Sequence, residues 1–268
     1  MATIDATFAG SIPGLYNRYL GPLLFEPYAA VVAERAAKLR PARILETAAG
    51  TGIVTAALHE ALPEAEIIAT DLNQAMLDVA AEQIRSDKVS FRATDAQSLP
   101  FGDSEFDLVV CQFGVMFFPD KVAANGEARR VLRRGGRYML IIWDRLERNL
   151  ATMVAGRAVA ALFPGNEAPF YERIPFRYHD PAVIEHDLLA AGFNDIEFET
   201  VELRSRLASA REAATGLCQG TPMRADIEAF GPDALERATE AAAEALRQFE
   251  GPDGFDAPMS AHIVTTIA

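Results

Sequence analysis

Short apolar runs of strand length alternate with runs of helical periodicity between residues 42 and 143. The predicted strands are 42–46, 66–70, 88–94, 106–113 and 136–143, and the predicted helices between them are 52–62, 73–85 and 121–132. Such alternation is typical of a parallel sheet with helices on both faces. The fold class predicted is therefore α/β.

Two of the strand-length runs are apolar throughout. They read "FDLVVCQF" and "YMLIIW", and a strand without polar alternation is expected where helices cover both faces of a sheet. We therefore place both in the middle of the sheet. Before the second run, "RRGG" supplies Gly135 and Gly136, which predict a turn between a helix and the strand.

The flanking regions are less regular. Glycine and proline interrupt the aromatic positions of residues 1–25, which predicts a loop-rich segment with a short helix, and a helix is expected from Pro27 until just before Pro41. The later helices are predicted at 148–162, 181–191, 209–219 and 233–249. Charged and apolar residues alternate in "NDIEFETVELRSRL", as in a strand near a sheet edge, and "SAHIVTTIA" has strand character.

Composition narrows the possible partners. The 268 residues are 50% hydrophobic and 24% charged, which fits one globular domain. The formal charge of −13 argues against nucleic-acid binding, because phosphate contacts need a basic surface. Small molecules are the expected partners. A local basic run is interpreted as a solvated helix end that complements the helix dipole; its members are Arg129, Arg130, Arg133, Arg134 and Arg137.

Cysteine usage and hydropathy indicate the compartment. The two cysteines, Cys111 and Cys218, predict neither a disulfide framework nor a cysteine zinc site, and no metal is expected. We see neither a secretion signal nor an apolar run of the roughly 18 residues that a membrane span needs. The expectation is a cytoplasmic protein without a membrane partner.

The first predicted strand runs into "ETAAGTG" and then directly into a helix. Small residues let a ligand approach the backbone, and the helix start offers free N–H groups. A dinucleotide site would read G-x-G-x-x-G, but from Gly50 the third position is Thr55. Glu46 would repel a pyrophosphate and suits an ammonium group. The alternative is that Glu46 only caps backbone amides.

Two further acids follow the next two strands. Asp71 lies where nucleoside sites place an acid for ribose hydroxyls, and Asn73 is expected to cap the next helix. Asp95 precedes the small Ala96, so it could accept a hydrogen bond from an adenine amino group while leaving room for the ring. Three acids aimed at an ammonium, a ribose and an adenine, without a lysine or arginine placed for phosphates, fit S-adenosylmethionine better than a dinucleotide.

At this point the chain resembles the class I S-adenosylmethionine-dependent methyltransferases. "ILETAAGTG" is similar to the family's first motif, usually E/D-x-G-x-G-x-G, with Ala48 at the first glycine, which narrows the backbone angles available there. "ATDLN" is similar to the second motif, "TDAQSLPFGDSEFDLVV" to the third and fourth, and "EARRVLRRGGRYML" to the helix, turn and fifth strand. The resemblance covers about residues 40 to 143.

The resemblance implies a Rossmann-like seven-stranded sheet, mostly parallel, whose last strand is antiparallel, with strands at 194–204 and 261–267 as the closing pair. It implies one methyltransferase domain over residues 1–268, divided into a lid and helix (1–40), a cofactor-binding core (41–145) and acceptor-side helices with closing strands (146–268). The expected cofactor-binding residues are Tyr16 and Tyr19 of the lid, Glu46, Thr47, Ala48, Gly50, Thr51, Gly52, Asp71, Leu72, Met76, Asp95, Ala96, Gln112 and Phe113.

Methyl transfer from a sulfonium is an in-line displacement, so the main task of such a protein is orientation. Where the acceptor must lose a proton, His179 or Asp144 is the candidate base, although His179 has the alternative role of capping a helix together with Asp180. Aromatic residues suggest an apolar or ring-bearing acceptor, or else core packing: Phe117, Phe118, Trp143, Phe170, Tyr171, Phe176 and Tyr178. Arg173 or Arg177 could hold a substrate carboxylate or lie exposed.

The expected activity is methylation of an O, N or C nucleophile on a small molecule, by a monomer or homodimer. One alternative is an NAD(P)-dependent oxidoreductase, although no tyrosine here has a lysine four residues later, as the Y-x-x-x-K pattern would require. The other alternative is a non-catalytic protein that binds S-adenosylmethionine without turnover.

Overall fold

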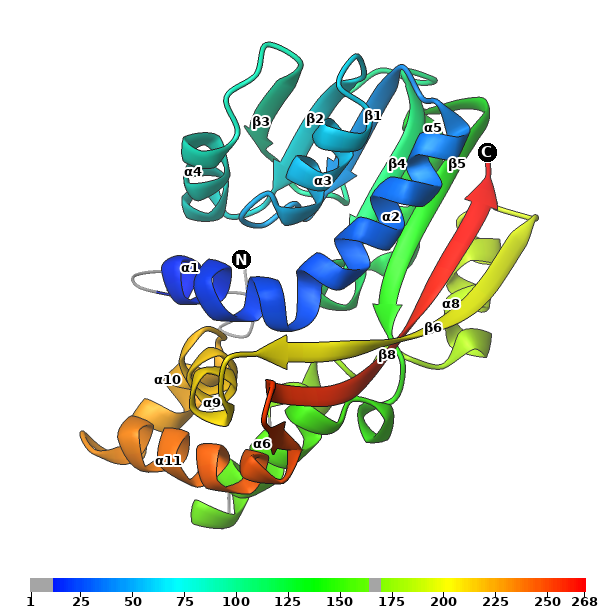
Figure 1. Cartoon of the computed structure of the whole chain (residues 1–268). Coiled ribbons are helices and arrows are strands. Elements are labelled where there is room, and N and C mark those ends of the chain that lie inside the picture. The colour runs from blue at the N-terminus through cyan, green and yellow to red at the C-terminus, as the bar shows by residue number, and fades with distance from the viewer. Residues whose placement is uncertain (1–11, 164–169) are drawn as a thin grey trace. The chain divides into compact units, whose positions relative to one another are not determined.

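The computed structural model describes residues 12–163 and 170–268. Its strands form one sheet in the order β3-β2-β1-β4-β5-β8-β6, and a two-residue strand, β7, pairs with β8 (Figure 1). Strands β1 to β5 pair in parallel, and β8 is antiparallel to β5. The strands are β1 Arg43–Thr47, β2 Glu66–Asp71, β3 Val89–Ala93, β4 Phe106–Gln112, β5 Leu132–Trp143, β6 Ile196–Leu207, β7 Glu250–Gly251 and β8 Gly254–Ile267. The α/β class, the seven main strands and the closing pair are confirmed.

Helices connect and flank these strands. The α-helices are α1 Ile12–Leu15, α2 Glu26–Leu39, α3 Ile53–Ala61, α4 Gln74–Gln83, α5 Lys121–Val131, α6 Leu150–Leu162, α7 Phe170–Arg173, α8 Pro181–Ala190, α9 Ala210–Gln219, α10 Met223–Glu228 and α11 Ala234–Leu246. The other helical segments are the π-helix η2 Tyr16–Phe25 and the short 3-10 helices η3 Val115–Phe117, η4 Leu146–Arg148 and η5 Arg247–Phe249. The helices predicted within the sheet region and after residue 147 are confirmed, whereas the short α7 and α10 had no expected counterpart.

The chain forms two compact units. The described parts of Met1–Pro27, Asp144–Arg177 and Glu202–Ser260 make up the first, and Tyr28–Trp143, Tyr178–Val201 and Ala261–Ala268 make up the second. The second unit holds β1 to β5, residues 196–201 of β6 and residues 261–267 of β8. The prediction of a single domain stays a prediction.

The core of the second unit lies along its central strands. In β4, the side chains from Leu108 to Cys111 are fully buried, as are the last residues of β5. In Figure 1, α2 and α3 lie in front of the sheet, while α5 packs against β5 and contacts α8. Burial on both faces explains why these two strands are apolar throughout, and their predicted central position is confirmed.

The edge strand β6 shows the expected alternation. It ends the sheet order, and its exposed residues alternate with half-buried ones over most of its length. A strand with one solvated face needs apolar side chains only at every second position. The prediction of an edge strand at 194–207 is therefore confirmed.

The interpretation of the N-terminal segment as loop-rich was wrong where the structure describes it. Residues 12–25 are helical, and η2 continues directly into α2, so Pro22 lies inside a helix and Pro27 does not start one. Tertiary packing explains this, because Leu20 is fully buried against the places where Gly216 of α9 and Gly220, the C-cap of that helix, lack a side chain. Residues 1–11 of the predicted loop lie outside the described residues.

The "RRGG" turn was also placed wrongly. Strand β5 begins at Leu132, directly after α5, and its pairing with β4 shifts from Phe106↔Leu132 to Leu108↔Arg137. Residues 133–136 therefore form an irregularity within the strand, at which Gly135 has a φ of +78°. The last strand likewise begins at Gly254, earlier than "SAHIVTTIA" indicated.

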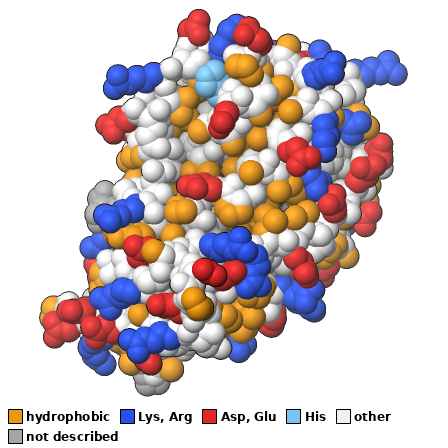
Figure 2. Space-filling model, in the orientation of Figure 1, with side chains coloured by type: hydrophobic (Ala, Val, Ile, Leu, Met, Phe, Trp, Pro, Cys, Tyr) orange, Lys and Arg blue, Asp and Glu red, His pale blue; other side chains and the backbone are white. Residues whose placement is uncertain are grey.

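Charged side chains of both signs share the surface. On the face in Figure 2, lysine and arginine side chains lie scattered among aspartate and glutamate. Both cysteines are buried and free. Among residues 12–163 and 170–268, no helix is long and apolar enough to cross a membrane.

Candidate functional site

Glu46 lies near the end of β1 and is almost fully buried, with 1% of its surface exposed. Its carboxylate accepts a hydrogen bond from the Thr55 hydroxyl of α3, with 2.6 Å between Oγ1 and Oε2. Burial raises the pKa of Glu46 to about 8, and the nearby Asp71 charge adds to the rise. A carboxylate that costs so much to ionise would gain from a cationic ligand.

The turn after β1 has an unusual backbone. Ala48, Gly50 and Gly52 have φ values of +54°, +56° and +82°. The first of these is costly for alanine, because a Cβ in the left-handed region crowds the following carbonyl. A Cβ built on Gly114 would lie 2.3 Å from the Ala48 Cβ. The turn is thus pressed against the segment after β4, which only a glycine allows.

Asp71, at the end of β2, connects two loops. Its Oδ2 accepts the Gly50 N–H at 2.9 Å, and its Oδ1 accepts the Asn73 N–H at 2.8 Å. Burial raises the pKa of Asp71, although these backbone hydrogen bonds act to lower it. The Asn73 side chain accepts from Ala75 N at 3.1 Å, so its predicted role as the cap of α4 is confirmed.

Asp95 lies two residues after β3 and is exposed. Its Oδ1 accepts the Gln97 N–H at 2.8 Å, and the Gln97 side-chain amide donates to both carboxylate oxygens at 3.1 and 3.2 Å. Ala96 beside it is half-buried. Since β3, β2 and β1 are adjacent parallel strands, Asp95, Asp71 and Glu46 all lie at the carboxyl-end edge of the sheet.

Apolar residues flank these acids. Leu72 exposes 59% of its surface directly after Asp71, whereas Met76 on α4 is buried and its Cε would lie 3.6 Å from a Cβ on Gly50. Thr47 and Thr51, on either side of the turn's centre, are buried. An exposed leucine beside the acid at the end of β2 is an apolar surface that an aromatic base could cover.

Gln112 is the last residue of β4, the strand on the other side of β1, and Phe113 follows it. Gln112 is half-buried, and Phe113 is buried with a φ of +54°. The Phe113 ring stacks on Trp143 with centroids 3.7 Å apart and meets Tyr28 edge-on at 5.4 Å. The Phe113 side chain is therefore part of an aromatic cluster within the second unit.

The expected lid residues Tyr16 and Tyr19 belong to the first unit. Tyr16 stacks on Phe25 with centroids 4.8 Å apart, and the Arg18 guanidinium lies 5.0 Å from the centre of the Tyr19 ring. Their role as a lid stays a prediction.

The two candidate bases have different surroundings. Asp144, in the first unit, accepts from the Ser260 hydroxyl at 2.9 Å and from Arg145 N at 2.7 Å. His179, in the second unit, is half-buried at the start of α8. The cap of that helix is Asp180, which accepts from Ala182 N at 2.9 Å.

The aromatic segment after residue 169 packs into the protein. Phe170, Tyr171 and Phe176 are buried and meet edge-on, and the Tyr171 hydroxyl donates to Leu217 O at 2.8 Å. Arg173 forms an ion pair with Asp226 at 2.9 Å, whereas Arg177 is exposed. The core-packing alternative thus describes these rings, within the first unit.

Three features of the site were missed by the sequence reasoning. Thr55 was noted only as the residue that breaks the dinucleotide pattern, and Gly114 was not singled out. Arg130 was interpreted as part of a solvated helix end, which was wrong: its guanidinium makes five hydrogen bonds to Glu127, Asp103 and two carbonyl groups. The spacing E-x-x-R on a helix was the one available signal for the pair.

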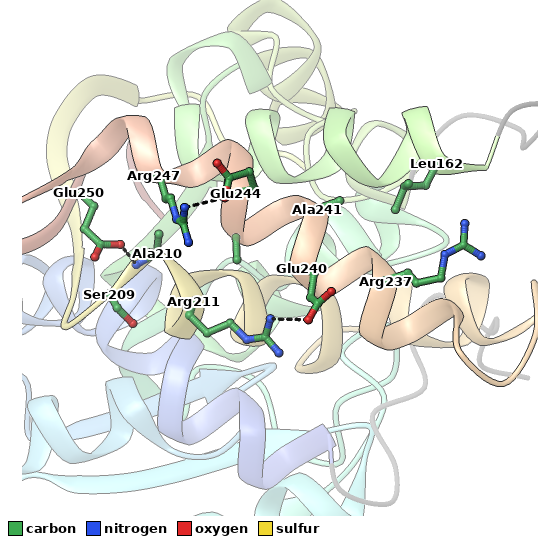
Figure 3. Close-up of a pocket in the computed structure, with 11 residues that line it drawn as sticks. Leu162, Ser209, Ala210, Arg211, Arg237, Glu240, Ala241, Glu244, Arg247 and Glu250 are labelled. Atoms are coloured by element: carbon green, nitrogen blue, oxygen red, sulfur yellow. Dashed lines mark hydrogen bonds and ion pairs between the residues drawn. The ribbon is translucent and has the colours of Figure 1, made fainter.

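The first unit has a surface groove, between α9 and α11, whose residues suggest neither a cofactor site nor a catalytic site. A surface cavity of about 720 Å³ is bounded by α9 and α11, where Arg211 faces Glu240 and Arg247 faces Glu244 (Figure 3). Most of its charged side chains are exposed and the two signs are balanced. We assign no site there.

Comparisons with known proteins agree with the geometry. Residues 45–140 match the family described as a methyltransferase domain. A demethylmenaquinone methyltransferase of Deinococcus radiodurans is 34% identical over 142 residues, which cover 52% of this chain and 59% of that protein. A ubiquinone/menaquinone biosynthesis C-methyltransferase of Methylobacterium nodulans is 35% identical over 123 residues, 44% of this chain and 49% of that protein. The chain spans about half the length of the curated relatives it matches.

Solved structures show the same fold at low identity. The YcgJ protein of Bacillus subtilis has a TM-score of 0.59 at 20% identity, covering 90% of this chain and 98% of that one. The [4+2]-cyclase SpnF has a TM-score of 0.59 at 22% identity, covering 91% of this chain and 81% of that one. The family match, the relatives and the order of acids support the methyltransferase interpretation over the oxidoreductase alternative. Over residues 45–140 the chain is thus similar to a methyltransferase domain, which supports its resemblance to the class I S-adenosylmethionine-dependent methyltransferases.

Proposed function

We propose that this protein binds S-adenosylmethionine and transfers its methyl group to a small-molecule acceptor. The observation that carries the proposal is the buried Glu46 beside Asp71, at the heads of adjacent parallel strands, with Asp71 holding the Gly50 amide of the turn. Acids in these places favour a ligand with a positive charge and free hydroxyl groups, and disfavour a pyrophosphate.

Each acid has a separate part of the ligand to bind. Glu46 takes the ammonium group, whose charge offsets the cost of ionising a buried carboxyl. Asp71 accepts from the ribose hydroxyls, because each of its oxygens has a second lone pair besides the one used by a backbone amide. Asp95 accepts from the adenine amino group.

The remaining contacts are backbone or apolar. The turn and the first amides of α3 approach the methionine part, because the first N–H groups of a helix have no partner within the helix. Leu72, Met76 and Ala96 contact the adenosine, and Gln112 and Phe113 lie below the sulfonium. We assign the contacts of the turn to Thr47, Ala48, Gly50, Thr51 and Gly52, and the lid to Tyr16 and Tyr19.

The reaction asks mainly for orientation. S-adenosylmethionine supplies a methyl group on a positively charged sulfur, and the residues of the chain hold the acceptor in line with it and exclude water. Such orientation contributes roughly 7 to 11 kcal/mol in model systems. Where the acceptor must lose a proton, Asp144 or His179 accepts it.

For the acceptor we propose an apolar, ring-bearing small molecule. Support comes from the curated relatives, whose names specify demethylmenaquinone and ubiquinone/menaquinone biosynthesis. Those relatives match only about half of this chain, so a demethylated quinone is the first acceptor to screen among several. We further propose that the protein acts in the cytoplasm as a monomer or homodimer, without a nucleic-acid partner, which its net charge of −13 supports.

Calorimetry tests the cofactor. S-adenosylmethionine and NADH are titrated separately into the wild type, Glu46→Gln and the exposed Glu60→Gln on α3. We expect binding of S-adenosylmethionine alone, weakened by Glu46→Gln and unchanged by Glu60→Gln. Binding of NADH in its place would refute the proposal.

Transfer of a labelled methyl group then tests the reaction. The acceptors are a demethylated naphthoquinone in its reduced form, a phenol and an amine. Labelled product from any of them supports the enzyme. Cofactor binding without transfer to these or to a small-molecule extract would instead favour a non-catalytic protein, since a fold shared with a cyclase does not fix the reaction.

A further inference from the structure

The loop between β3 and β4 is fastened to helix α5 by one pair of charged side chains. The Glu127 carboxylate and the Arg130 guanidinium form a fork, with Nε to Oε1 at 2.7 Å and Nη2 to Oε2 at 2.8 Å. Both side chains are largely shielded from solvent, with 21% and 32% of their surfaces exposed. The fork is thus well placed to hold backbone groups.

The same two side chains bind the loop backbone at consecutive points. Glu127 Oε2 accepts Leu99 N at 2.7 Å, and Arg130 Nη2 donates to Leu99 O at 3.0 Å. Arg130 Nη1 donates to Phe101 O at 2.8 Å. The helix backbone adds two bonds, from Ser104 N to Arg130 O and from Glu105 N to Val131 O. The backbone N–H and the carbonyl group of Leu99 are therefore both held by the Glu127–Arg130 ion pair.

Glu127 and Arg130 thus form a clamp on Leu99. Leu99 is connected to Asp95 by a single tight turn. Ser98 N donates to Asp95 O at 3.0 Å, so Asp95 and Leu99 flank a closed turn. On the other side, Thr94 N donates to Asp71 O at 2.9 Å. Gln97 adds a link, because it donates to Asp95 and its Oε1 accepts Asp120 N at 2.9 Å at the start of α5. Asp95 is exposed, so its position depends on these anchors and not on burial.

We propose that Arg130 and Glu127 are positioning residues that set the adenine-binding loop, so that Asp95 is in place before the cofactor arrives and selects the adenine amino group. This inference rests on the proposed function, which supplies the adenine ligand of Asp95. An arginine suits the task because its planar group donates in several fixed directions, whereas a lysine would reach fewer of these acceptors.

The test compares two ligands that differ at one position of the base. S-adenosylhomocysteine carries the amino group, and its inosine analogue has an oxo group there. Dissociation constants are measured by calorimetry for the wild type, Arg130→Met, Arg130→Lys, Glu127→Gln and the exposed Arg134→Met, with thermal unfolding of each. The ratio of the two constants reports adenine selection, whereas a general loss of stability lowers the unfolding temperature without changing that ratio.

We expect the wild type to prefer the adenosine ligand by about tenfold or more, as for a hydrogen bond to a charged group. Arg130→Met and Glu127→Gln should lose most of that preference, Arg130→Lys should retain part of it, and Arg134→Met should keep it. An unchanged ratio in the two disrupting variants, or no preference in the wild type, overturns the inference. If Arg130→Met does not fold, Arg130→Lys and Glu127→Gln decide.

The two proposals fail differently. If the wild type binds neither ligand, the proposed function is refuted. If it binds S-adenosylhomocysteine selectively and the clamp variants do so equally well, only the positioning role is refuted.

Discussion

The end of β1 and the loop after β3 both present an acid at the carboxyl-end edge of the sheet, but they hold it in different ways. Glu46 is buried, and its partner Thr55 is only nine positions away in the chain. Asp95 is exposed, and the loop that carries it is fixed by Glu127 and Arg130, about thirty residues later in the chain. Local burial sets the chemistry of the first acid, and a distant clamp sets the geometry of the second.

This difference decides what each acid can do without a ligand. Desolvation raises the pKa of Glu46, so its carboxyl holds a proton at neutral pH until a cation replaces it. Asp95 is exposed and has no such burial. Binding of a cationic ligand should therefore displace a proton from Glu46.

The largest expected effect is the pH dependence of stability that Glu46 introduces. Its folded pKa of about 8 exceeds the unfolded value of 4.5, so between these values the folded state holds the extra proton and stability falls as the pH rises. One group gives a slope of about 1.4 kcal/mol per pH unit. Denaturant unfolding of the wild type from pH 5 to 8 should lose about 4 kcal/mol more than Glu46→Gln does. Parallel pH profiles would show that Glu46 is ionised in the folded protein.

The second effect concerns Asp71, which joins the two regions. Asp71→Ala removes a carboxylate that holds Gly50 N and, in the proposed function, the ribose. The cofactor affinity should fall by about 1.5 to 3 kcal/mol, the range for hydrogen bonds to charged groups. Calorimetry measures it, and Asp78→Ala on the surface of α4 is the control. An unchanged affinity in Asp71→Ala would remove this residue from the site.

The third effect tests the strained turn. Gly114→Ala should lower the free energy of unfolding by about 1 to 3 kcal/mol, because the new methyl group would overlap the Ala48 Cβ. Ala48→Gly should raise stability, since it relieves a positive φ, and the double variant should recover most of the loss. Gly126→Ala on α5, where a new Cβ has open space, is the control. If Ala48→Gly gives no rescue, the contact is not the cause.

The sequence predicted the regular part of the molecule because the relevant signals are local. Strand runs, helical periodicity and the acid at each strand end depend on neighbouring residues, and the sheet and most helix positions were confirmed. The predicted cofactor residues Glu46, Asp71 and Asp95 lie at or just beyond the carboxyl ends of three adjacent strands in the structure. Their contacts with a ligand remain the proposal.

The failures involve partners distant in the sequence. Glycine and proline in residues 12–25 suggested loops, but Gly216 of α9 and its C-cap Gly220 leave room for a helix there. Arg130 looked solvated because two of its acceptors are loop carbonyl groups that lie 29 and 31 residues earlier in the chain. No periodic pattern in the sequence predicts the positive φ of Ala48 or its close contact with Gly114. Such packing depends on how the fold brings segments together.

The smallest expected effect distinguishes the two carboxylates that pair with Arg130, the more buried Glu127 and the exposed Asp103. Arg130 also pairs with Asp103 at 2.8 Å, but the Asp103 side chain is 77% exposed, and water screens such pairs. Asp103→Asn should change the free energy of unfolding by less than about 0.5 kcal/mol, whereas Glu127→Gln should cost about 1.5 to 3 kcal/mol because it turns a donor toward Arg130 or Leu99 N.

The pH dependence of the Glu127 contribution distinguishes the two carboxylates further. The hydrogen bonds from Arg130 lower the pKa of Glu127, so its stabilisation is present above the ordinary glutamate value and is lost as the pH falls below it. Denaturant unfolding at neutral and acidic pH should therefore bring Glu127→Gln and the wild type closer together in acid. Glu46 and Glu127 thus predict opposite slopes of unfolding free energy against pH. Burial disfavours the ionised form of Glu46, whereas Arg130 favours the ionised form of Glu127. Asp103→Asn and Glu127→Gln could instead lower the free energy of unfolding equally at neutral pH. That result would mean that the more buried position of Glu127 has no advantage and that the loop is held by its backbone hydrogen bonds alone.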